Sequence, residues 1–502
     1  MTQVGAGLAA ARSARAIRPG ERIHVVGIAG AGASAAGLLA GRAGADVSGC
    51  DPGGPSPYTA ALESAGIPMS WAHDSAHVTD GPPADRLAVT KALTAIDPDH
   101  PELRAARDAG IPVESWQQVI ADAAVGRRLI GVAGTHGKST TAGWLVHVLV
   151  SAGLDPCAFV GALLPPAITD GPAATARWGS GREFVVEADE YAGNFAAYRP
   201  DIAILTSVEW DHPDVFADAA AVADAFEGWL RRAPDGATLV ANAADRGVEV
   251  VLEHLWDLPF TIVRYALLDD GSDATAQDAD ITGRIIAADP DGTTLEICGL
   301  DGRDELATIR LATAGRHNAA NALAVAGAAR AVGLDAVAIA HGLASFSGVG
   351  RRLERKGEAA GVVVYDDYAH HPTAIRETLR AIRQREPERR VWAVYEPLTY
   401  HRTAALLDAF AEALAEADAV AIADIWAGRD PDTTIASAQG LADAVMARRS
   451  GITAAAPGSV EATAAWLSHE VCPGDVVLVM GGGRSYRIGE LLLAAFEAME
   501  AR

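Results

Sequence analysis

The sequence is short of positive charge and of cysteine, and it has no long hydrophobic run. Lys and Arg number 41 against 65 Asp and Glu, which gives a formal net charge of −24 at pH 7. An acidic surface of this kind disfavours nucleic acid or an anionic membrane as the main partner. No apolar run reaches the roughly 20 residues that a membrane-spanning helix needs. Small anionic substrates stay compatible with the sequence, because a local basic cleft can exist on an acidic protein.

The cysteines are few, and they form no CxxC pair. They are Cys50, Cys157, Cys298 and Cys472. This spacing favours reduced thiols in a cytoplasmic protein over a disulfide framework or a zinc site. Residues 1–21 are rich in Ala and Arg but contain no continuous apolar segment, so a signal peptide is not expected. We predict that this stretch is a flexible extension of the chain.

The order of apolar runs, glycine turns and helical patterns predicts an α/β protein of three domains in series. We predict a Rossmann-like N-terminal domain over 22–122 and a central P-loop domain with a mostly parallel sheet over 123–347. A C-terminal Rossmann-like domain follows over 348–502. Residues 260–312 hold short alternating runs and many turn residues, which favour an added antiparallel patch in the central domain.

The stretch GVAGTHGKSTT at 131–141 is typical of a phosphate-binding loop between a buried strand and a helix. Lys138 can reach terminal phosphates, and Ser139 or Thr140 offers a hydroxyl to Mg²⁺. The spacing is shorter than in the usual loop, because Val132 stands where a glycine is expected. The alternative is a tight strand-to-helix turn with a surface lysine, which this specific combination of residues disfavours.

Acidic and imidazole side chains follow two further strands of the central domain. Glu187, Asp189 and Glu190 end the run FVVEADE, and His212 ends DIAILTSVEWDH. Carboxylates at the ends of parallel strands, close to a phosphate loop, suit Mg²⁺, which prefers oxygen ligands. The alternatives are a solvated acidic loop and an edge histidine with an ordinary hydrogen bond.

The first domain carries a glycine-rich turn with Gly27, Gly30 and Gly32, and Asp51 ends the next strand. Gly30, Gly32 and Ala35 form a GxGxxA pattern, which predicts a bound nucleotide or diphosphate. The pattern does not distinguish NAD from a UDP group. Elsewhere, Asn318 and Asn321 share one face of a predicted helix. In the third domain, the run YDDYAHHPTAI at 365–375 crowds titratable groups at a strand end, which suggests a site.

The motifs GIAGAG, GTHGKST, EADE, EWDH, GRHN, GRR, DDYAHHPT and Pro-x-x-x-x-Arg-Thr occur in one order, which resembles the Mur ligases of peptidoglycan synthesis. The resemblance covers about residues 22–490, and GTHGKST and DDYAHHPT are its most specific parts. It implies a cytoplasmic enzyme, a monomer or homodimer, that uses ATP and Mg²⁺ to form an amide bond. The implied reaction passes through an acyl phosphate and supplies cell-wall precursors needed for cell shape and division.

The resemblance also implies which residues act. Those implied for UDP-N-acetylmuramate are Gly30, Ala31, Gly32, Ser34, Asp51 and His73. Those implied for ATP are Gly134, Thr135, His136, Gly137, Lys138, Ser139, Thr140, Asn318, Asn321, Arg352 and Asp367. Ser139 and Glu187 would hold one Mg²⁺, and His212 would hold a second Mg²⁺. The residues implied in catalysis are Lys138, Glu187, His212, His371 and Arg402, of which the last two would help to bind the incoming amino acid.

The acceptor that the resemblance implies is L-alanine, with the tripeptide of a murein-recycling ligase as the alternative. Glu396-Pro397 is closer to the recycling enzymes, whereas Arg402-Thr403 and the absence of a long insertion after EADEY favour L-alanine. TKAL at 90–93 departs from the family pattern on the sugar side. Glu227 stands near the place where some Mur ligases carry a carbamylated lysine, so no carbamylation is expected.

Three further hypotheses stay open on the sequence alone. A folate polyglutamate ligase belongs to the same superfamily, but the glycine-rich first domain argues against it. A nicotinamide oxidoreductase would explain the first domain and would leave GTHGKST and EADE unexplained. A non-catalytic nucleotide-binding partner in a cell-wall complex is disfavoured by the full set of phosphate-handling residues.

Overall fold

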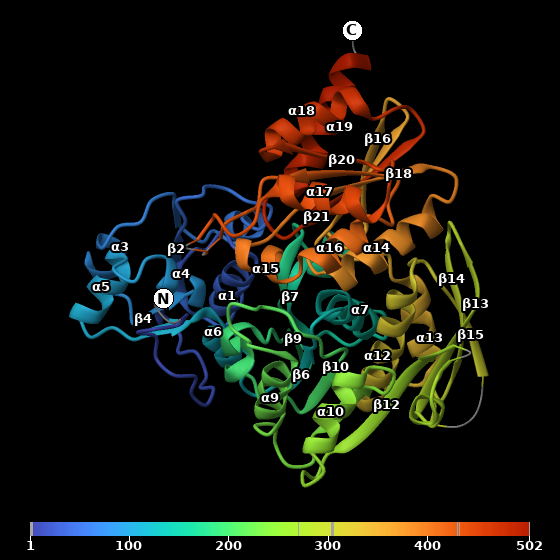
Figure 1. Ribbon diagram of the computed structural model, residues 1–502. Helices are drawn as coiled ribbons and strands as arrows, with labels where there is room; N and C mark the ends of the chain where they lie inside the picture. Colours follow the sequence, from blue (N-terminus) through green and yellow to red (C-terminus); the bar gives the residue numbers. More distant parts are fainter. Residues whose placement is uncertain (1–3, 270, 303–305, 429, 431, 501–502) are drawn as a thin grey trace.

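The computed structural model describes residues 4–500 except 270, 303–305, 429 and 431. Within these residues, three sheets follow one another along the chain, each covered by helices (Figure 1). The first domain is blue in that view, the central domain runs from teal to yellow, and the third is orange to red. This arrangement confirms the predicted α/β class with three domains. In the described part of the chain, no helix is long and apolar enough to cross a membrane.

The first sheet is parallel, with the strand order β3-β2-β1-β4-β5, which is the order of a Rossmann-type unit. Its strands are β1 (Arg22–Val26), β2 (Asp46–Cys50), β3 (Met69–Ser70), β4 (Arg86–Val89) and β5 (Val113–Ser115). Its helices are α1 (Ala31–Arg42), α2 (Ala60–Ser64), α3 (Ala76–Thr79), α4 (Lys91–Ile96), α5 (Pro101–Asp108) and α6 (Trp116–Ala123). The glycine turn lies between β1 and α1, where the topology switches direction.

The central sheet has the order β15-β14-β13-β12-β11-β10-β6-β9-β7-β8. Its strands are β6 (Arg128–Ala133), β7 (Cys157–Leu164), β8 (Ala174–Arg177), β9 (Glu183–Glu187), β10 (Ile202–Leu205), β11 (Thr238–Asn242), β12 (Thr261–Leu268), β13 (Ile281–Asp289), β14 (Gly292–Cys298) and β15 (Leu306–Leu311). Its helices are α7 (Lys138–Ser151), α8 (Pro166–Thr169), the 3-10 helix η1 (Tyr191–Ala197), α9 (Ala219–Leu230), α10 (Arg246–His254), α11 (Ala274–Gln277), α12 (Arg316–Val332) and α13 (Ala336–Ser345). Antiparallel pairing is confined to β13–β14–β15 and to β7–β8, whereas β12 and β13 pair in parallel with their preceding neighbours.

The third sheet has the order β16-β17-β21-β18-β19-β20, and only β16 is antiparallel to its neighbour. Its strands are β16 (Glu354–Ala359), β17 (Val362–Asp367), β18 (Arg390–Glu396), β19 (Ala419–Ala423), β20 (Thr453–Gly458) and β21 (Asp475–Gly481). Its helices are α14 (Pro372–Arg385), α15 (Tyr400–Ala405), α16 (Leu407–Leu414), α17 (Ala438–Arg448), α18 (Val460–Glu470) and α19 (Tyr486–Glu500).

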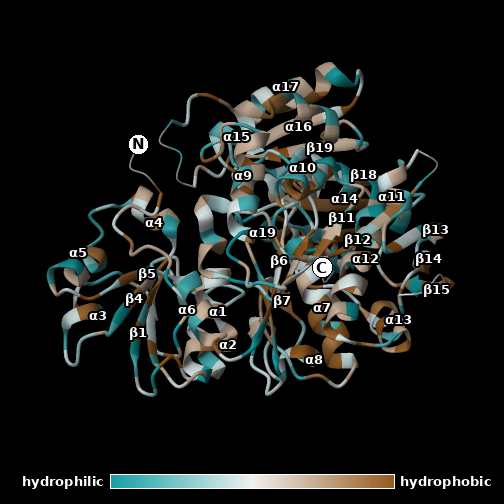
Figure 2. Cartoon of the chain, turned by 90° about the horizontal axis from the view of Figure 1, so that it is seen from below, coloured by the Kyte–Doolittle hydropathy of each residue, from teal (hydrophilic) through white to brown (hydrophobic). Residues whose placement is uncertain are grey.

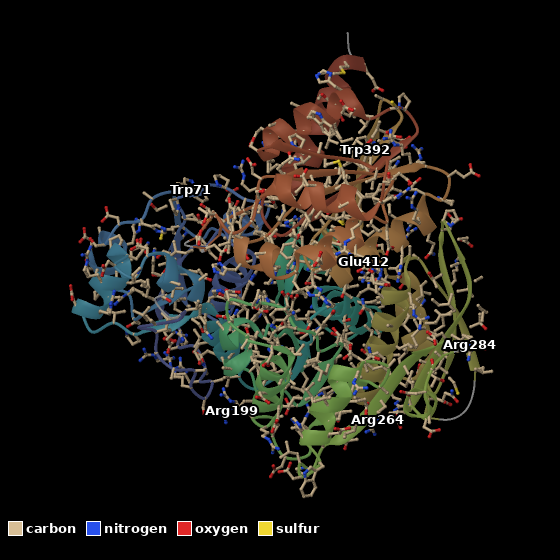
Figure 3. All side chains as sticks on the ribbon, in the orientation of Figure 1. Trp71, Arg199, Arg264, Arg284, Trp392 and Glu412 are labelled. Atoms are coloured by element: carbon tan, nitrogen blue, oxygen red, sulfur yellow. The ribbon has the colours of Figure 1, made fainter. Side chains whose placement is uncertain are left out.

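Hydrophobic residues fill both faces of the central and third sheets, as the brown segments of Figure 2 indicate. One apolar cluster runs without a break from the first domain into the central one, and Trp116 packs edge-on against Phe159 at 5.3 Å between ring centroids. In Figure 3, Arg199, Arg264 and Arg284 lie at the outer edge of the central domain, away from the junction of the domains. The first two domains therefore share an apolar contact.

The prediction of a flexible extension over 1–21 is wrong for the described residues 4–21. Arg12 forms ion pairs with Glu114 at 2.9 Å and with Asp122 at 2.7 Å, and the backbone N–H of Ala9 donates to Val113 O at 2.8 Å. Ile17 is buried in the first core. Composition did not reveal these contacts, because the acidic partners lie about a hundred residues further along the chain.

Candidate functional site

A cavity of about 590 Å³ lies where the three domains meet. Its lining includes Gly32 from the first domain, Lys138 and Glu187 from the central domain and Asp367 from the third. A neighbouring cavity of about 610 Å³ is lined by several basic side chains, which are Arg351, Arg352, Arg355, Lys356 and Arg385. The acidic residues of this lining, Glu354, Asp366 and Glu490, are fewer than the basic ones, so the cavity suits an anionic substrate on an acidic protein.

The predicted phosphate loop joins β6 to α7 and presents the helix N-terminus to the cavity. Gly137 has a φ of 81°, and a Cβ there would come within 2.5 Å of Asn321 Oδ1. Lys138 Nζ donates to Gly134 O at 2.6 Å, to Thr135 O at 3.2 Å and to Glu190 Oε2 at 2.9 Å. The positive end of the helix dipole and the lysine together form an anion site.

The polar ends of β9 and β10 lie against this loop, as parallel strands require. Both strands are shorter than the predicted runs, because their polar tails bond to the loop instead of to the sheet. Thr206 Oγ1 donates to Ala133 O at 3.1 Å, and the N–H of Glu209 donates to Thr135 Oγ1 at 2.9 Å. Hydrogen bonds from the residues that follow β10 therefore fix the backbone of the phosphate loop.

Ser139 and Glu187 offer oxygen ligands at one side of the cavity. Ser139 Oγ donates to Glu187 Oε1 at 3.0 Å, and Gly161 N donates to Glu187 Oε2 at 2.6 Å. Asp189 faces the same cavity. Its burial alone would raise the pKa of its carboxyl, but the charges of Lys138 and His212 outweigh burial and hold that pKa below its usual range.

His212 stands further along the same edge, with a left-handed backbone at φ 56°. Its ligand atom lies within 4.8 Å of those of Asp189 and Glu190, so these three form a group that could hold a cation. Glu187 is not in that group. Ser139 and the carboxylates of Glu187 and Asp189 fit Mg²⁺, which prefers oxygen, whereas the imidazole nitrogen of His212 is a poorer ligand for it.

The third domain places Arg352 and Asp367 in the same cavity. Arg352 Nη2 donates to Ser139 Oγ at 2.7 Å across the domain boundary, and its guanidinium lies 4.8 Å from the ring centroid of Tyr368. Asp367 accepts hydrogen bonds from the N–H groups of Leu353 and Ala369 at 2.6 and 2.7 Å. Arg352 is thus positioned by a stacked ring and reaches the phosphate loop.

Arg402 comes from α15, is only 4% exposed and contacts the cavity lining from behind without being part of it. Its Nη2 donates to Asp211 Oδ1 at 2.7 Å and to His212 Nδ1 at 2.9 Å. Its Nε is buried and has no hydrogen-bond partner in the structure. A buried guanidinium with one donor unused is suited to a small carboxylate.

His371 forms a second group of side chains with His136 and Glu209 at the entrance of α14. His136 Nε2 lies 2.8 Å from Glu209 Oε2, and the two imidazole rings lie 4.8 Å apart. Thr373 Oγ1 donates to Glu209 Oε1 at 2.7 Å. Burial, and then the charge of His136, lowers the pKa of His371 to about 4, so this imidazole is neutral near pH 7.

The paired asparagines lie at the start of α12, beside the phosphate loop. Asn321 Nδ2 donates to Asn318 Oδ1 at 3.3 Å, and Asn318 Nδ2 donates to Ala314 O at 2.8 Å. Both residues line the cavity together with Thr135, His136 and Thr140. The structure therefore brings the predicted ATP residues of the central and third domains to one place.

The residues implied for the UDP-sugar are less uniform in position. Ala31 and Gly32 line the central cavity, whereas Ser34 is fully buried and donates to Ala31 O at 2.9 Å. Asp51 accepts a hydrogen bond from Ala29 N at 3.2 Å, which ties β2 to the glycine turn that contains Gly30. His73 lies beside Cys50, at 3.2 Å from its sulfur, and is not part of the cavity lining.

Sequence reasoning missed two contacts of the site. Glu209 lies inside the quoted EWDH motif, but its role in joining His136 to the third domain could not be seen without the fold. Lys91 stands in the unusual TKAL stretch, and its Nζ donates to the carbonyls of Ala192 and Gly193 at 2.8 Å each. The only signal in the sequence was that TKAL departs from the family pattern. In the structure, Lys91 of this stretch joins the first domain to the central domain.

Known proteins match this chain over nearly its whole length. Family profiles match at 22–128 (Mur ligase family, catalytic domain), 132–329 (Mur ligase middle domain) and 351–483 (Mur ligase, glutamate ligase domain). A protein of Kineococcus radiotolerans named UDP-N-acetylmuramate–L-alanine ligase is 40% identical over 94% of this chain and 95% of its own.

Solved structures agree with the fold. A UDP-N-acetylmuramate-alanine ligase from Thermotoga maritima has a TM-score of 0.77 at 24% identity and covers 95% of this chain and 99% of its own. A murein peptide ligase from Psychrobacter arcticus has a TM-score of 0.71 at 26% identity, with the same coverage. The resemblance predicted from the order of the motifs is thereby confirmed, and the chain belongs to the Mur ligase family.

Proposed function

We propose that this enzyme joins L-alanine to the lactyl carboxylate of UDP-N-acetylmuramate at the expense of ATP. The name of the Kineococcus relative, UDP-N-acetylmuramate–L-alanine ligase, supports these substrates. The observation that carries the proposal is the connection between Lys138 and the buried Arg402. Arg402 bonds to His212 in the cavity lining, the ligand atom of His212 lies within 4.8 Å of that of Glu190, and Glu190 pairs with Lys138. An ATP-dependent amino-acid ligase requires a phosphate site and a carboxylate site next to each other.

ATP fits the central part of the cavity on the chemistry of its lining. The phosphate loop with Lys138 suits the phosphates, and the Asn318–Asn321 pair offers amide groups for the adenosine side. Ser139 and Glu187 would hold one Mg²⁺, and His212 with its neighbour Asp189 would hold a second. When bound, Mg²⁺ supplies charge neutralisation on the phosphate oxygens. We retain the prediction that His212 belongs to the metal site, and the neighbouring Asp189 is added to it.

The residues of this chain perform positioning and charge stabilisation, and no protein nucleophile is required. A lactyl carboxylate oxygen attacks the γ-phosphorus of ATP, which gives an acyl phosphate and ADP. Lys138 and Arg352 stabilise the charge of the phosphoryl group during transfer. The alanine amine then attacks the acyl carbon, phosphate leaves, and the amine gives up a proton. Arg402 orients the alanine carboxylate through paired hydrogen bonds, and neutral His371 lies beside it.

The alternative acceptor is the tripeptide of a murein-recycling ligase. The similarity to the Psychrobacter enzyme and the Glu396-Pro397 sequence favour it. However, Glu396 is 3% exposed, its Oε2 has no partner in the structure, and it is absent from the lining of the central cavity. Arg402 is also absent from that lining, but it bonds to the lining residues Asp211 and His212, whereas no hydrogen bond among the described residues joins the Glu396 side chain to the lining. Glu396 is therefore a weak argument for the tripeptide.

The test is phosphate release by the purified protein with ATP, Mg²⁺ and UDP-N-acetylmuramate, with L-alanine, L-serine, glycine or the tripeptide supplied in parallel. Release with L-alanine, together with a product heavier by one alanine residue, is expected. Release with the tripeptide alone would move the enzyme to recycling. ATP binding without release for any acceptor would overturn the ligase proposal. The cytoplasmic location and the monomeric or dimeric state stay predictions.

A further inference from the structure

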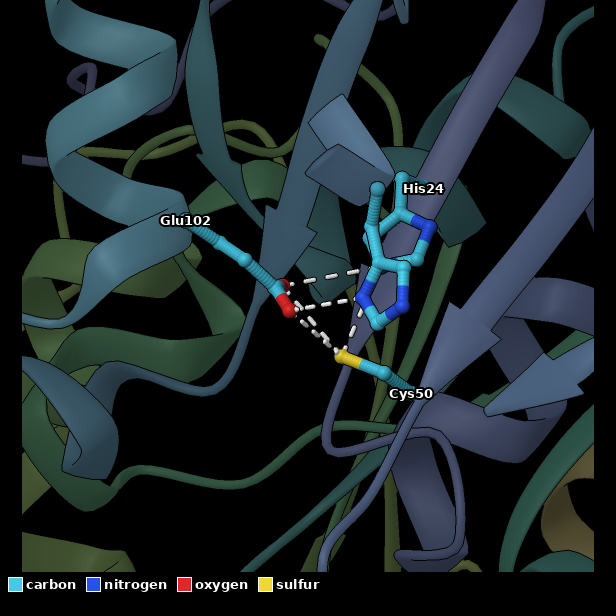
Figure 4. A group of neighbouring side chains, drawn as sticks. His24, Cys50 and Glu102 are labelled. Atoms are coloured by element: carbon cyan, nitrogen blue, oxygen red, sulfur yellow. Dashed lines mark hydrogen bonds and ion pairs between the residues drawn. The ribbon is translucent and has the colours of Figure 1, made fainter. Parts of the chain in front are cut away.

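A second cluster of chemically active side chains lies inside the first domain, outside the site described above. Its members are His24 from β1, Cys50 at the end of β2, His77 from α3 and Glu102 from α5. Figure 4 shows His24, Cys50 and Glu102 converging from three elements on one point. His24, Cys50 and Glu102 are buried, and the side chain of His77 is 23% exposed.

The ligand atoms of this cluster have the spacing of a coordination shell. Cys50 Sγ lies 3.1 Å from Glu102 Oε1 and 3.4 Å from His24 Nε2. Glu102 lies 3.0 Å from His77 Nδ1 and 3.5 Å from His24 Nε2. Tetrahedral Zn²⁺ with its usual bond lengths separates neighbouring ligand atoms by roughly 3.3–3.6 Å. All four ligand atoms lie within 4.8 Å of one another, so small shifts would complete that shell.

The charge of the cluster points to a cation. The side chain of Glu102 is fully buried, and among the described residues every ion-pair partner the structure gives it is a histidine. A buried carboxylate without a permanent counter-charge is costly. One thiolate, one carboxylate and two neutral imidazoles around a divalent cation add up to zero net charge, which removes that cost.

Further imidazoles surround the cluster. His73 Nδ1 lies 3.2 Å from Cys50 Sγ and 3.6 Å from Glu102 Oε1. The ring of His100 packs edge-on against that of His73 at 4.2 Å, and both ring nitrogens of His100 are buried without a hydrogen-bond partner. More nitrogen donors are therefore gathered here than the hydrogen bonds of the metal-free protein use.

We propose that His24, Cys50, His77 and Glu102 bind Zn²⁺. The mixture of one sulfur, two nitrogens and one oxygen suits a borderline-soft ion with tetrahedral preference. On binding, a sulfur–zinc bond forms and the Cys50 thiol gives up its proton to water. The absence of a CxxC pair indicated no zinc site, but spacing rules do not detect a shell whose ligands come from four separate elements.

The proposed zinc ion would link several elements of the first domain. It joins α3 and α5 to the middle of β1 and the end of β2. Asp51 follows Cys50 directly and accepts the hydrogen bond from Ala29 in the glycine turn. Zinc on Cys50 therefore fixes the end of β2 against the turn that faces the central cavity. The inference does not depend on the proposed function.

The test measures zinc in the full-length protein, purified without a histidine tag, by mass spectrometry of the metal. We expect one zinc per chain in the wild type and in Cys472→Ala, whose cysteine is exposed. Cys50→Ala and His77→Gln should lose it, with about tenfold or greater weakening of zinc affinity in a competition titration. Glu227→Gln is the matched control and should keep the zinc, because Glu227 belongs to a second group of possible ligands, with the exposed residues Asp224 and His254, that our proposal leaves without zinc.

Cobalt substitution gives a readout that does not rest on the stability of the variants. Co²⁺ bound to the wild type should show a thiolate-to-metal charge-transfer absorption, and His77→Gln should shift its visible bands. Wild-type protein that contains no zinc and takes up none from a Zn²⁺ titration would overturn the proposal. Cobalt that binds without the thiolate absorption would also overturn it.

Discussion

At the scale of single residues, Lys138 carries the strongest expectation. It is the cation nearest the phosphate loop, and its amino group already bonds to two loop carbonyls and to Glu190. Lys138→Ala should lower kcat for phosphate release by about 10²–10³, which is typical for the loss of one transition-state charge contact. Arg448→Ala, which removes an exposed arginine paired with Asp408 away from both cavities, is the control and should change kcat little. Equal losses in both variants would contradict the assignment.

His371 gives a pH prediction. Burial, and then His136, lowers its pKa from 6.5 to about 4. Between pH 4 and pH 6.5 the unfolded chain binds more protons at this imidazole than the folded protein does. The stability that the neutral His371 imidazole contributes is therefore fully present above pH 6.5 and is lost as the pH falls toward 4. The loss is on the order of 3 kcal/mol for this group. Thermal unfolding from pH 4 to 8 should show a smaller pH dependence in His371→Gln than in the wild type.

Exposed His469 supplies the matched substitution for this experiment. His469→Gln should leave the slope of the unfolding temperature against pH as it is in the wild type. An unchanged slope in His371→Gln would mean that its imidazole is as easily protonated in the folded protein as in the unfolded chain.

At the scale of elements, the phosphate loop depends on a glycine for its shape. Gly137 has a φ of 81°, and an added Cβ would come within 2.5 Å of Asn321 Oδ1. Gly137→Ala therefore combines backbone strain with a clash, and ATP affinity measured by calorimetry should fall at least tenfold. Gly153→Ala is matched for backbone strain, because Gly153 has a φ of 78° and nothing within 4 Å of its Cβ position. It should lose about 1 kcal/mol of stability and keep its ATP affinity.

The N-terminal segment gives a second prediction at this scale. Arg12 reaches Asp122, whose side chain is fully buried, and it also pairs with Glu114. Arg12→Ala should lower the free energy of unfolding of the first domain by about 1–3 kcal/mol, because it leaves buried carboxylates short of donors. Arg18→Ala removes a longer pair, 3.8 Å from Glu21, made by an arginine whose side chain is 68% exposed, and it should cost far less, because Arg15 and Arg86 also pair with Glu21. Similar unfolding temperatures for the two variants would restore the idea of a flexible extension.

The elements differ in how far the sequence could predict them. Buried runs such as β17 and β18 are apolar and bounded by turns, so their positions followed from the pattern. The edge strands β16, with ERKGEA, and β20, with TAAAPG, lack that signal, because an edge strand buries less of its surface. The loop with Lys138 and Ser139 was visible as one local motif. The contacts of Glu209, Lys91 and the histidine cluster join residues far apart in sequence, so only the fold brings them together.

At the scale of the whole molecule, binding is divided among the three domains. The phosphate loop belongs to the central domain, the glycine turn to the first and Arg402 to the third, and all three reach one junction. Arg352 and Arg402 both form hydrogen bonds with the central domain across the boundary. The third domain therefore delivers its side chains to the site only when it is docked, which suits an enzyme that assembles three substrates.

This division predicts that the effects of mutations on different substrates can be separated. Arg402→Lys keeps a positive charge but loses the paired geometry of the guanidinium. We expect the KM for L-alanine to rise about 10–100-fold, while the Kd for ATP in the absence of alanine changes less than about twofold, because the phosphate loop lies in another domain. Arg487→Lys, whose half-exposed side chain on α19 of the same domain pairs with Glu490, should change neither constant. An ATP affinity that falls together with alanine affinity would show that Arg402 acts through docking of the domain and not through the amino acid.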